Sequence, residues 1–179
     1  MAMNAARVGQ PMPCGNEGAG TVVAAGSSPV AQAMLGATVS GVSGSMYASH
    51  TKLSHVMCIP VPGGIAAADA ASSFVNPLTA LGMTETMRLE GHSAIVHTAA
   101  ASNLGQMLNR LCQADGIPLV NVVRRNEQAD LLRAAGAEHV VVSSADSFAD
   151  DLTVAITATG ATLAFDAIGG GEQVDTLLA

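Results

Sequence analysis

Paired cysteines, a secretory leader and long apolar runs are all missing from this 179-residue sequence. The three cysteines, Cys14, Cys58 and Cys112, are odd in number and far apart, and no C-x-x-C pair occurs. This pattern indicates neither a disulfide framework nor a structural zinc lobe, so we expect free thiols in a reducing cytosol. The N-terminal segment lacks the apolar stretch of a secretory signal, and no apolar run reaches the roughly 18 residues of a membrane-spanning helix. We therefore expect a cytoplasmic protein without a membrane partner.

Charged and aromatic side chains are scarce as well. Charged residues make up 12% of the chain and hydrophobic residues 49%, which argues against a disordered protein and permits a sizeable core. The net charge of -7 argues against nucleic acid as the main partner. One tyrosine and three phenylalanines are the only aromatic residues, so the core must be built from many small aliphatic side chains.

The first third of the sequence predicts short β-strands. Pro11 and Pro13 restrict the backbone of an irregular lead-in at residues 1–13. Strand-like segments then occur at residues 21–26, 37–42, 46–48 and 53–60, separated by glycine, serine and proline. This spacing is typical of a small antiparallel or barrel-like β unit.

Helices are predicted after the composition changes at Pro62-Gly63-Gly64. The Ala-rich residues 65–72 predict a first helix. Pro77 disfavours helical geometry at Asn76 and suits the first turn of a second helix. We expect that helix from about Leu78 to Leu89, with Gly91 as its C-terminal stop.

From Ser93 onward, segments of strand length alternate with amphipathic segments. Strands are predicted at residues 94–96, 119–123, 139–142 and 162–166, and helices at about 104–112, 127–135 and 147–158. The last helix would place Phe148, Leu152, Ala155 and Ile156 on one face. This order predicts an α/β fold with a doubly wound parallel (Rossmann) sheet, right-handed crossovers and helices on both faces.

The loop between the first parallel strand and its helix is the candidate anion site. Residues 98–103 carry almost no side-chain bulk, and the first N–H groups of a helix favour a phosphate. Aligned on Gly105, the dinucleotide fingerprint G-x-G-x-x-G appears as Ala100-x-Ser102-x-x-Gly105, with two of three glycines replaced. The alternative is an ordinary strand–helix turn. The position of the loop at the start of the alternating unit favours a dinucleotide site, where the Ser102 hydroxyl is a further phosphate ligand.

The end of the second parallel strand indicates which dinucleotide binds. Arg124 and Arg125 follow this strand, and Arg124 lies 22 positions after Ser102. Enzymes that use NAD place an acidic residue here, whereas an arginine accommodates the 2′-phosphate of NADP. The alternative is a pair of solvated arginines near a helix N-terminus. We favour NADP(H), because the helix dipole disfavours cations at that end.

Five segments together resemble the medium-chain dehydrogenase/reductase family, most of all its zinc-independent branch of quinone oxidoreductase-like and enoyl-reductase-like enzymes. They occur in the order of the family. They are residues 13–22 (PCGNEGAGTV), 76–80 (NPLTA), 99–105 (AAASNLG), 132–141 (LRAAGAEHVV) and 165–170 (FDAIGG).

The resemblance implies an NADPH-dependent oxidoreductase that transfers hydride to a quinone or an α,β-unsaturated carbonyl acceptor. It also implies a partial GroES-like catalytic segment at residues 1–72, before a partial NADP-binding Rossmann domain at residues 73–179. Asn76 is a weaker candidate for the cofactor site, with a structural role as a helix cap as an equal alternative. Gly169 and Gly170 would line the adenosine side, with an ordinary turn at the end of the strand as an equal alternative. No general acid is assigned. The expected cofactor-binding residues are Thr79, near the nicotinamide, Ala101, Ser102, Asn103, Leu104 and Gly105, near the pyrophosphate, Arg124 and Arg125, at the 2′-phosphate, and Gly169, on the adenosine side.

Two departures from the family qualify this interpretation. Asn16 stands where zinc-dependent members have a histidine ligand, and the four-cysteine lobe is missing, so we expect no metal. His97 is expected to be a hydrogen-bonded structural residue. Family members are nearly twice as long, so we expect a truncated chain with an exposed sheet edge that forms a homo-oligomer. A non-catalytic nucleotide-binding module and an inert fragment are the rival hypotheses.

Overall fold

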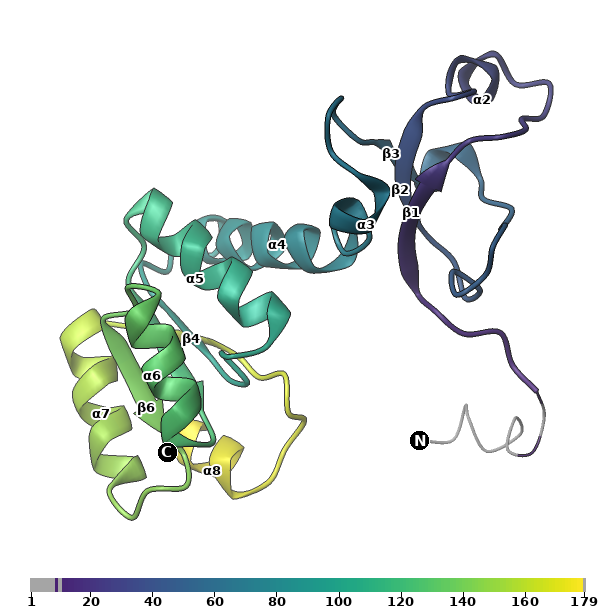
Figure 1. Ribbon diagram of the computed structural model, residues 1–179. Coiled ribbons are helices and arrows are strands. Elements are labelled where there is room, and N and C mark those ends of the chain that lie inside the picture. Colours follow the sequence, from purple (N-terminus) through teal and green to yellow (C-terminus); the bar gives the residue numbers. More distant parts are fainter. Residues whose placement is uncertain (1–8, 10, 179) are drawn as a thin grey trace. The chain divides into compact units, whose positions relative to one another are not determined.

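The computed structural model describes residue 9 and residues 11–178, and the chain divides into two compact units, Met1–Val75 and Asn76–Ala179 (Figure 1). The expected absence of a secretory signal, and most of the irregular lead-in, concern residues outside the described part. The assignment of residues 1–72 and 73–179 to a GroES-like segment and a nucleotide-binding domain stays a prediction.

The first unit is built on a three-stranded antiparallel sheet, which corresponds to the antiparallel one of the two predicted arrangements and has one strand fewer than expected. The strands β1 (Glu17–Thr21), β2 (Thr38–Val42) and β3 (Cys58–Pro60) lie in the order β1-β2-β3. Ser40 at the centre of β2 is opposite Ala19 on one side and Ile59 on the other. The connections hold the short helices α2 (Pro29–Ala33) and α3 (Ala67–Ala70) and the 3₁₀ helix η1 (His55–Met57).

Three of the predicted strands in this unit were misplaced. The strand expected at residues 21–26 lies earlier, at Glu17–Thr21. Pairing of the backbone of Gly18, Ala19 and Gly20 with β2 fixes this position, and these residues carry no bulky side chains that would have marked the strand in the sequence. Residues 46–48 form a bend: the amides of Met46 and Tyr47 donate to the carbonyls of Gly15 and Cys14. Only Cys58–Pro60 of the segment 53–60 is extended, since η1 occupies His55–Met57.

The second unit has the predicted alternating order. Helix α4 (Val75–Leu89) comes first, and it is followed by β4 (Ile95–His97), α5 (Asn103–Asp115), β5 (Leu119–Val123), α6 (Asn126–Ala134), β6 (His139–Val142), α7 (Phe148–Thr159), β7 (Leu163–Phe165) and α8 (Glu172–Leu178). The four strands are parallel, in the order β6-β5-β4-β7. This is the spatial order 3-2-1-4 of the first four strands of a doubly wound sheet, and it confirms the predicted fold class.

Alternation along β5 shows how helices cover both faces of the sheet. Leu119 and Val123 point to one face, where Leu119 packs with Leu108 of α5, and Val123 with Leu132 of α6. Val120 and Val122 point to the other face and pack with α7, whose residues Leu152 and Ala155 are buried there as predicted. The core is made of small aliphatic side chains on both faces.

Helix α4 starts earlier than the sequence predicts. We expected it from Leu78, but it begins at Val75, so Pro77 lies within its first turn, where a proline costs no hydrogen bond. The carboxylate of Glu17 accepts hydrogen bonds from the amides of Phe74 (3.3 Å) and Val75 (2.7 Å). A carboxylate at this end satisfies helix N–H groups that have no partner in the helix.

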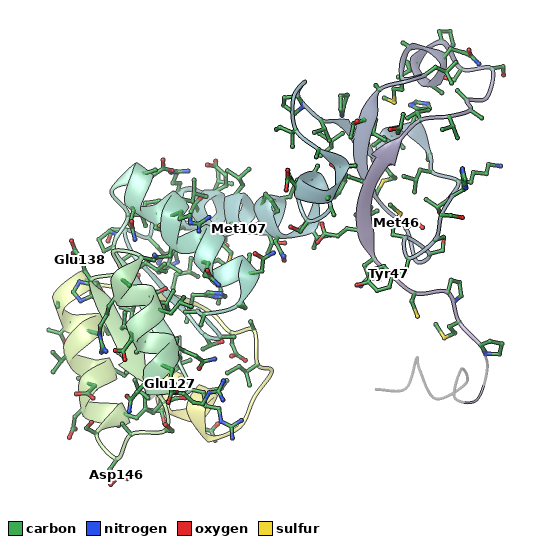
Figure 2. All side chains as sticks on the ribbon, viewed as in Figure 1. Met46, Tyr47, Met107, Glu127, Glu138 and Asp146 are labelled. Atoms are coloured by element: carbon green, nitrogen blue, oxygen red, sulfur yellow. The ribbon has the colours of Figure 1, made fainter. Side chains whose placement is uncertain are left out.

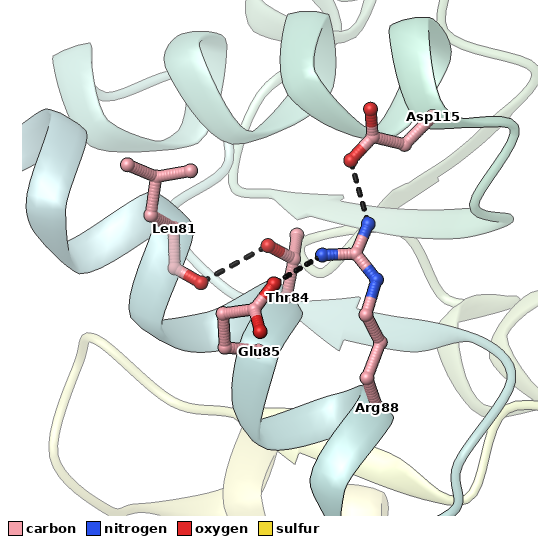
Figure 3. A network of polar contacts seen from close by, with 5 residues as sticks. All are labelled: Leu81, Thr84, Glu85, Arg88 and Asp115. Carbon is pink, nitrogen blue, oxygen red and sulfur yellow. Dashed lines mark hydrogen bonds and ion pairs between the residues drawn. The ribbon is translucent and has the colours of Figure 1, made fainter.

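The C-terminal half of α4 is tied to α5 by an arginine. Arg88 donates to Glu85 one turn earlier and to Asp115 at the end of α5, the latter at 2.6 Å (Figure 3). These two hydrogen bonds raise the pKa of the guanidinium above its ordinary value. The network lies on the surface and joins two helices of the same unit. No helix of the described residues is long and apolar enough to cross a membrane.

Candidate functional site: the carboxyl edge of the parallel sheet

The loop between β4 and α5 carries only small side chains, so no bulky group of the loop lies at the N-terminus of α5. Ser102 is the N-cap of α5, and its hydroxyl oxygen accepts a hydrogen bond from the amide of Gly105 at 3.1 Å. Ser102 and Asn103 are exposed, and the first amides of α5 have no partner within the helix. The cap leaves the hydroxyl hydrogen of Ser102 able to donate outward, so the geometry is that of an anion site.

Gly105 packs so closely on this loop that no side chain fits. A Cβ atom at Gly105 would lie 2.1 Å from the carbonyl oxygen of Ala100, which is backbone and cannot turn away. Ala99 adopts a left-handed conformation with φ of 50°, which lets the chain turn between β4 and α5. The last glycine of the dinucleotide fingerprint has this packing role, so Gly105 meets the structural requirement of that position.

The structure brings the arginines to the same edge. Ala100 donates its amide to the carbonyl of Val122, and Ala100 and Val123 belong to one buried cluster, against which Ala101 packs. Arg124 follows Val123 directly. The loop and the arginines are therefore neighbours at the ends of two adjacent parallel strands.

Arg124 and Arg125 are exposed, and neither takes part in an ion pair of the described residues. Arg125 is the N-cap of α6, a position where arginine is not favoured. The side-chain oxygen of Gln128 accepts the amides of both arginines at 3.1 Å, so their guanidinium groups are not needed to cap the helix. Two cations at the positive end of a helix suit a phosphate ligand better than they suit the helix.

The end of β7 is fastened to the end of β4 by Asp166, a residue that sequence reasoning missed. Its carboxylate accepts the hydroxyl of Thr98 at 2.6 Å and the amides of Ile168, Gly169 and Gly170. The Thr98 hydroxyl lowers the pKa of Asp166 most, and the three amides lower it further. The Asp-x-x-Gly-Gly order was the available signal, since a carboxylate commonly bonds to the amides that follow it.

Gly169 therefore lies at the candidate edge, in a turn that needs glycine. Gly169, Gly170 and Gly171 have φ of 91°, 110° and 88°, values that side-chain-bearing residues rarely adopt. The two readings of Gly169, as a cofactor contact or as a strand-end turn, are both compatible with this position. Its role at the adenosine stays a prediction.

His97 is a buried structural residue, as expected. Its ring is fully buried at the end of β4, and Nδ1 lies 3.2 Å from the carbonyl oxygen of Phe165. Because a carbonyl only accepts, Nδ1 carries the proton and Nε2 is left as an unpartnered acceptor. Burial lowers the pKa of His97, against smaller opposing effects of the Phe165 carbonyl and Asp166, so the ring is neutral at pH 7.

The remaining predicted residues lie on α4. Asn76 is within the first turn of α4, which corrects its alternative interpretation as the helix cap. Thr79 is half-buried and precedes Ala80, which belongs to the same buried cluster as Ile95 of β4. The proximity of Thr79 to a nicotinamide stays a prediction. Among the described residues, no three histidine, cysteine, aspartate or glutamate side chains come together as metal ligands. The expected absence of zinc rests on the substitution at Asn16.

A parallel sheet in this order, with a small-residue loop at the start of α5 and basic residues after β5, is the arrangement typical of Rossmann-type dinucleotide-binding domains. No protein-family model matches the sequence. The human mitochondrial enoyl-[acyl-carrier-protein] reductase is 31% identical over 133 residues, which cover 71% of this chain and 36% of that protein.

Solved structures of quinone reductases have a similar fold. A Mesorhizobium loti protein described as a candidate NADPH:quinone reductase superimposes with a TM-score of 0.83 at 33% identity, over 91% of this chain and 48% of that one. The Escherichia coli quinone oxidoreductase solved with NADPH is 22% identical and shares the fold, with a TM-score of 0.79 over 94% of this chain and 52% of that one. The chain belongs to the medium-chain dehydrogenase/reductase superfamily, in its quinone oxidoreductase and enoyl reductase branch. It spans about half the length, or less, of these relatives.

Proposed function

We propose that the carboxyl edge of the second unit binds NADP(H), and that the chain is the cofactor-binding part of a zinc-free oxidoreductase. The observation that carries this proposal is the juxtaposition of the α5 N-terminus, sealed by Gly105 against Ala100, with the exposed arginines after β5. The α5 amides would hold the pyrophosphate, and Arg124 and Arg125 the 2′-phosphate. An enzyme of this branch would use the bound cofactor to reduce a quinone or an α,β-unsaturated carbonyl compound.

The residues of this chain would act by placement and by charge. The small loop lets a pyrophosphate approach the backbone, and the turn of Asp166 holds β7 beside β4 at the point where the strand order reverses. We assign no proton donor, and a proton from solvent would complete the reduction of the acceptor. A cytoplasmic location stays our prediction, although the human relative is mitochondrial.

A binding experiment on the 179-residue chain tests the cofactor proposal. Calorimetric titration is expected to show tighter binding of NADPH than of NADH by about 10- to 100-fold, since hydrogen bonds to a charged phosphate contribute about 1.5–3 kcal/mol. The double variant Arg124→Ala/Arg125→Glu is expected to lose this preference. Arg133→Ala is the matched control, because this arginine of α6 is occupied with Asp130. A wild-type chain that prefers NADH would contradict the NADP assignment.

The alternative functions are separated by two further results. A non-catalytic nucleotide-binding module would bind NADPH with the same preference but would not oxidise it in the presence of a small quinone or enone. An inert fragment would bind neither nucleotide.

A further inference from the structure

The turn after β7, residues 167–171, is held in place by one carboxylate. Asp166 Oδ1 accepts the Thr98 hydroxyl at 2.6 Å and the Ile168 amide at 3.1 Å. Asp166 Oδ2 accepts the amides of Gly169 at 2.6 Å and Gly170 at 3.3 Å. Each carboxylate oxygen therefore has two donors, and we refer to residues 167–171 as the glycine turn.

The Thr98 hydroxyl fastens the glycine turn to the end of β4, because it both donates and accepts. It donates to Asp166 and accepts the amide of Ala167 at 2.8 Å. Thr98 is only 1% exposed and directly precedes the small-residue loop of the candidate cofactor edge, whereas Asp166 is exposed. A buried residue at the start of that loop thus anchors an exposed turn from the neighbouring strand.

The glycine turn needs such an anchor more than an ordinary turn does. Gly169, Gly170 and Gly171 all have positive φ, and glycine loses more conformational freedom on ordering than any other residue. A segment that becomes ordered only when a ligand binds lowers the affinity for that ligand. A carboxylate that orders the turn beforehand therefore favours the binding of any group that the turn contacts.

The strand order decides which part of a dinucleotide meets the glycine turn. Strands β5 and β7 lie on opposite sides of β4, so the arginines after β5 and the glycine turn after β7 flank the loop before α5. The inference rests on the proposed function, in which these arginines hold the 2′-phosphate and the α5 amides hold the pyrophosphate. A dinucleotide bound in this way continues past the pyrophosphate towards β7. Its nicotinamide half then approaches the glycine turn, which differs from the adenosine-side contact expected for Gly169.

We propose that Asp166 is a positioning residue of the cofactor site, which acts through Thr98 to order the glycine turn as a wall for the nicotinamide half of NADP(H). The carboxylate itself does not contact the cofactor, since both of its oxygens are engaged by the Thr98 hydroxyl and the amides of the turn. The charge of Asp166 gives the proposal a distinctive sign. NADP(H) is an anion, so removal of a nearby carboxylate would strengthen binding by charge alone, whereas loss of the anchor weakens it.

Calorimetric titration of the full chain with NADPH and with 2′,5′-ADP tests the proposal. The second ligand carries the adenosine and the 2′-phosphate but lacks the nicotinamide half. Asp166→Asn keeps the size of the side chain, but its NH₂ group cannot accept the amides of Gly169 and Gly170. We expect NADPH affinity to fall by about tenfold or more, the scale of a hydrogen bond to a charged group, and 2′,5′-ADP affinity to change by less than about twofold.

Matched variants separate position from charge. Asp146→Asn removes the same charge from an exposed aspartate after β6, which Figure 2 shows at the opposite end of the unit from Glu138, and it is expected not to weaken NADPH binding. Thr98→Val removes the anchoring hydroxyl and is expected to reproduce Asp166→Asn, whereas Thr98→Ser keeps the hydroxyl and is expected to bind NADPH as the wild type does. Thr84→Val is the control for loss of a buried hydroxyl, because Thr84 is equally buried and bonds within α4.

Asp166→Asn keeps the test decisive if Thr98→Val alters the fold, because Asp166 is exposed. Hydrogen exchange without nucleotide gives a separate readout: the Gly169 and Gly170 amides are expected to exchange faster in Asp166→Asn. Unchanged or stronger NADPH binding in that variant would overturn the proposal, as would an equal loss for NADPH and 2′,5′-ADP; both results leave the proposed function intact. A wild-type chain that binds neither ligand would overturn the proposed function and this inference together.

Discussion

The two compact units differ sharply in how much core they contain. Among the described residues, 21 hydrophobic residues are buried, and only Val39 and Ala70 of these belong to the first unit. In the same unit Val23, Tyr47 and Val56 are 70%, 84% and 73% exposed. The antiparallel unit is therefore held mainly by its backbone ladder, whereas the parallel unit carries three clusters of buried side chains. We expect the second unit to unfold cooperatively and the first to open at lower free energy.

The largest difference in stability between the two units is expected when a core side chain of the second unit is truncated. Leu108 is fully buried between α5 and the sheet, so Leu108→Ala is expected to cost about 3 kcal/mol, within the range of 2–5 for such changes. Ile59→Ala in β3, where the side chain is 40% exposed, is expected to cost about 1 kcal/mol or less. Urea unfolding followed by hydrogen exchange in each unit measures both. Similar losses from the two variants would remove the contrast.

Glycine substitutions sharpen the comparison at the level of the backbone. Gly105→Ala forces a Cβ onto the Ala100 carbonyl and is expected to cost about 2 kcal/mol or more and to weaken NADPH binding. A Cβ at Gly41 in β2 would lie 2.7 Å from the Met57 carbonyl oxygen, a less severe overlap than the 2.1 Å at Gly105, so we expect a smaller loss of stability from Gly41→Ala.

Gly82 supplies the control for that experiment. It lies in α4 with open space around it, so Gly82→Ala is expected to stabilise the chain by about 0.5–1 kcal/mol through helix propensity. Thermal unfolding of the three variants would rank them, and a Gly105→Ala variant as stable as Gly82→Ala would show that the loop can yield.

Acid is expected to weaken the parallel unit through His97. Burial lowers the pKa of His97 in the folded state. Below the unfolded-state pKa of about 6.5, the unfolded chain therefore binds a proton more readily than the folded chain does. The contribution of the neutral His97 ring to stability is thus fully present above that pH and is lost progressively as the pH falls below it. The melting temperature of His97→Gln is expected to lose this part of the pH dependence. An unchanged slope in that variant would assign the effect to other groups.

The smallest effect is expected from the surface network of α4 and α5. Arg88→Met removes the pairs with Glu85 and Asp115 but keeps the length of the side chain. Exposed ion pairs contribute little and are screened by salt, so the loss is expected to be slight in dilute buffer and to vanish near about 1 M salt. Melting curves at the two salt concentrations measure it. A loss that persists at high salt would mean that packing of the side-chain stem matters more than its charge.

The sequence predicted the parallel unit well because local pattern and tertiary environment agree there. Residues 119–123 and 139–142 were expected as strands and are β5 and β6 with the same bounds. Their β-branched side chains are buried between helices, so hydrophobicity marks the element directly. Gly116 and Gly160 end their helices in the left-handed conformation, which glycine adopts without strain.

Long-range contacts account for what the sequence did not reveal. The start of α4 depends on Glu17, which is 58 positions away from Val75. The position of β1 depends on pairing of Gly18 and Ala19 with β2, and glycine has no strand preference of its own. At the candidate site, the loop, Gly105 and the arginines were found from spacing. The bond between Asp166 and Thr98 joins two strand ends 68 positions apart, and only the fold brings them together.

The three thiols of this chain differ in a way that offers a chemical handle. Burial raises the pKa of the Cys112 thiol to about 11, and it also raises the pKa of Cys58. Only the thiolate attacks an electrophile, and Cys14 is the exposed thiol of the set. A maleimide dye added in limiting amount near pH 7 is therefore expected to attach to Cys14 first. That single tag would report on the sparsely packed antiparallel unit while the parallel unit stays chemically untouched.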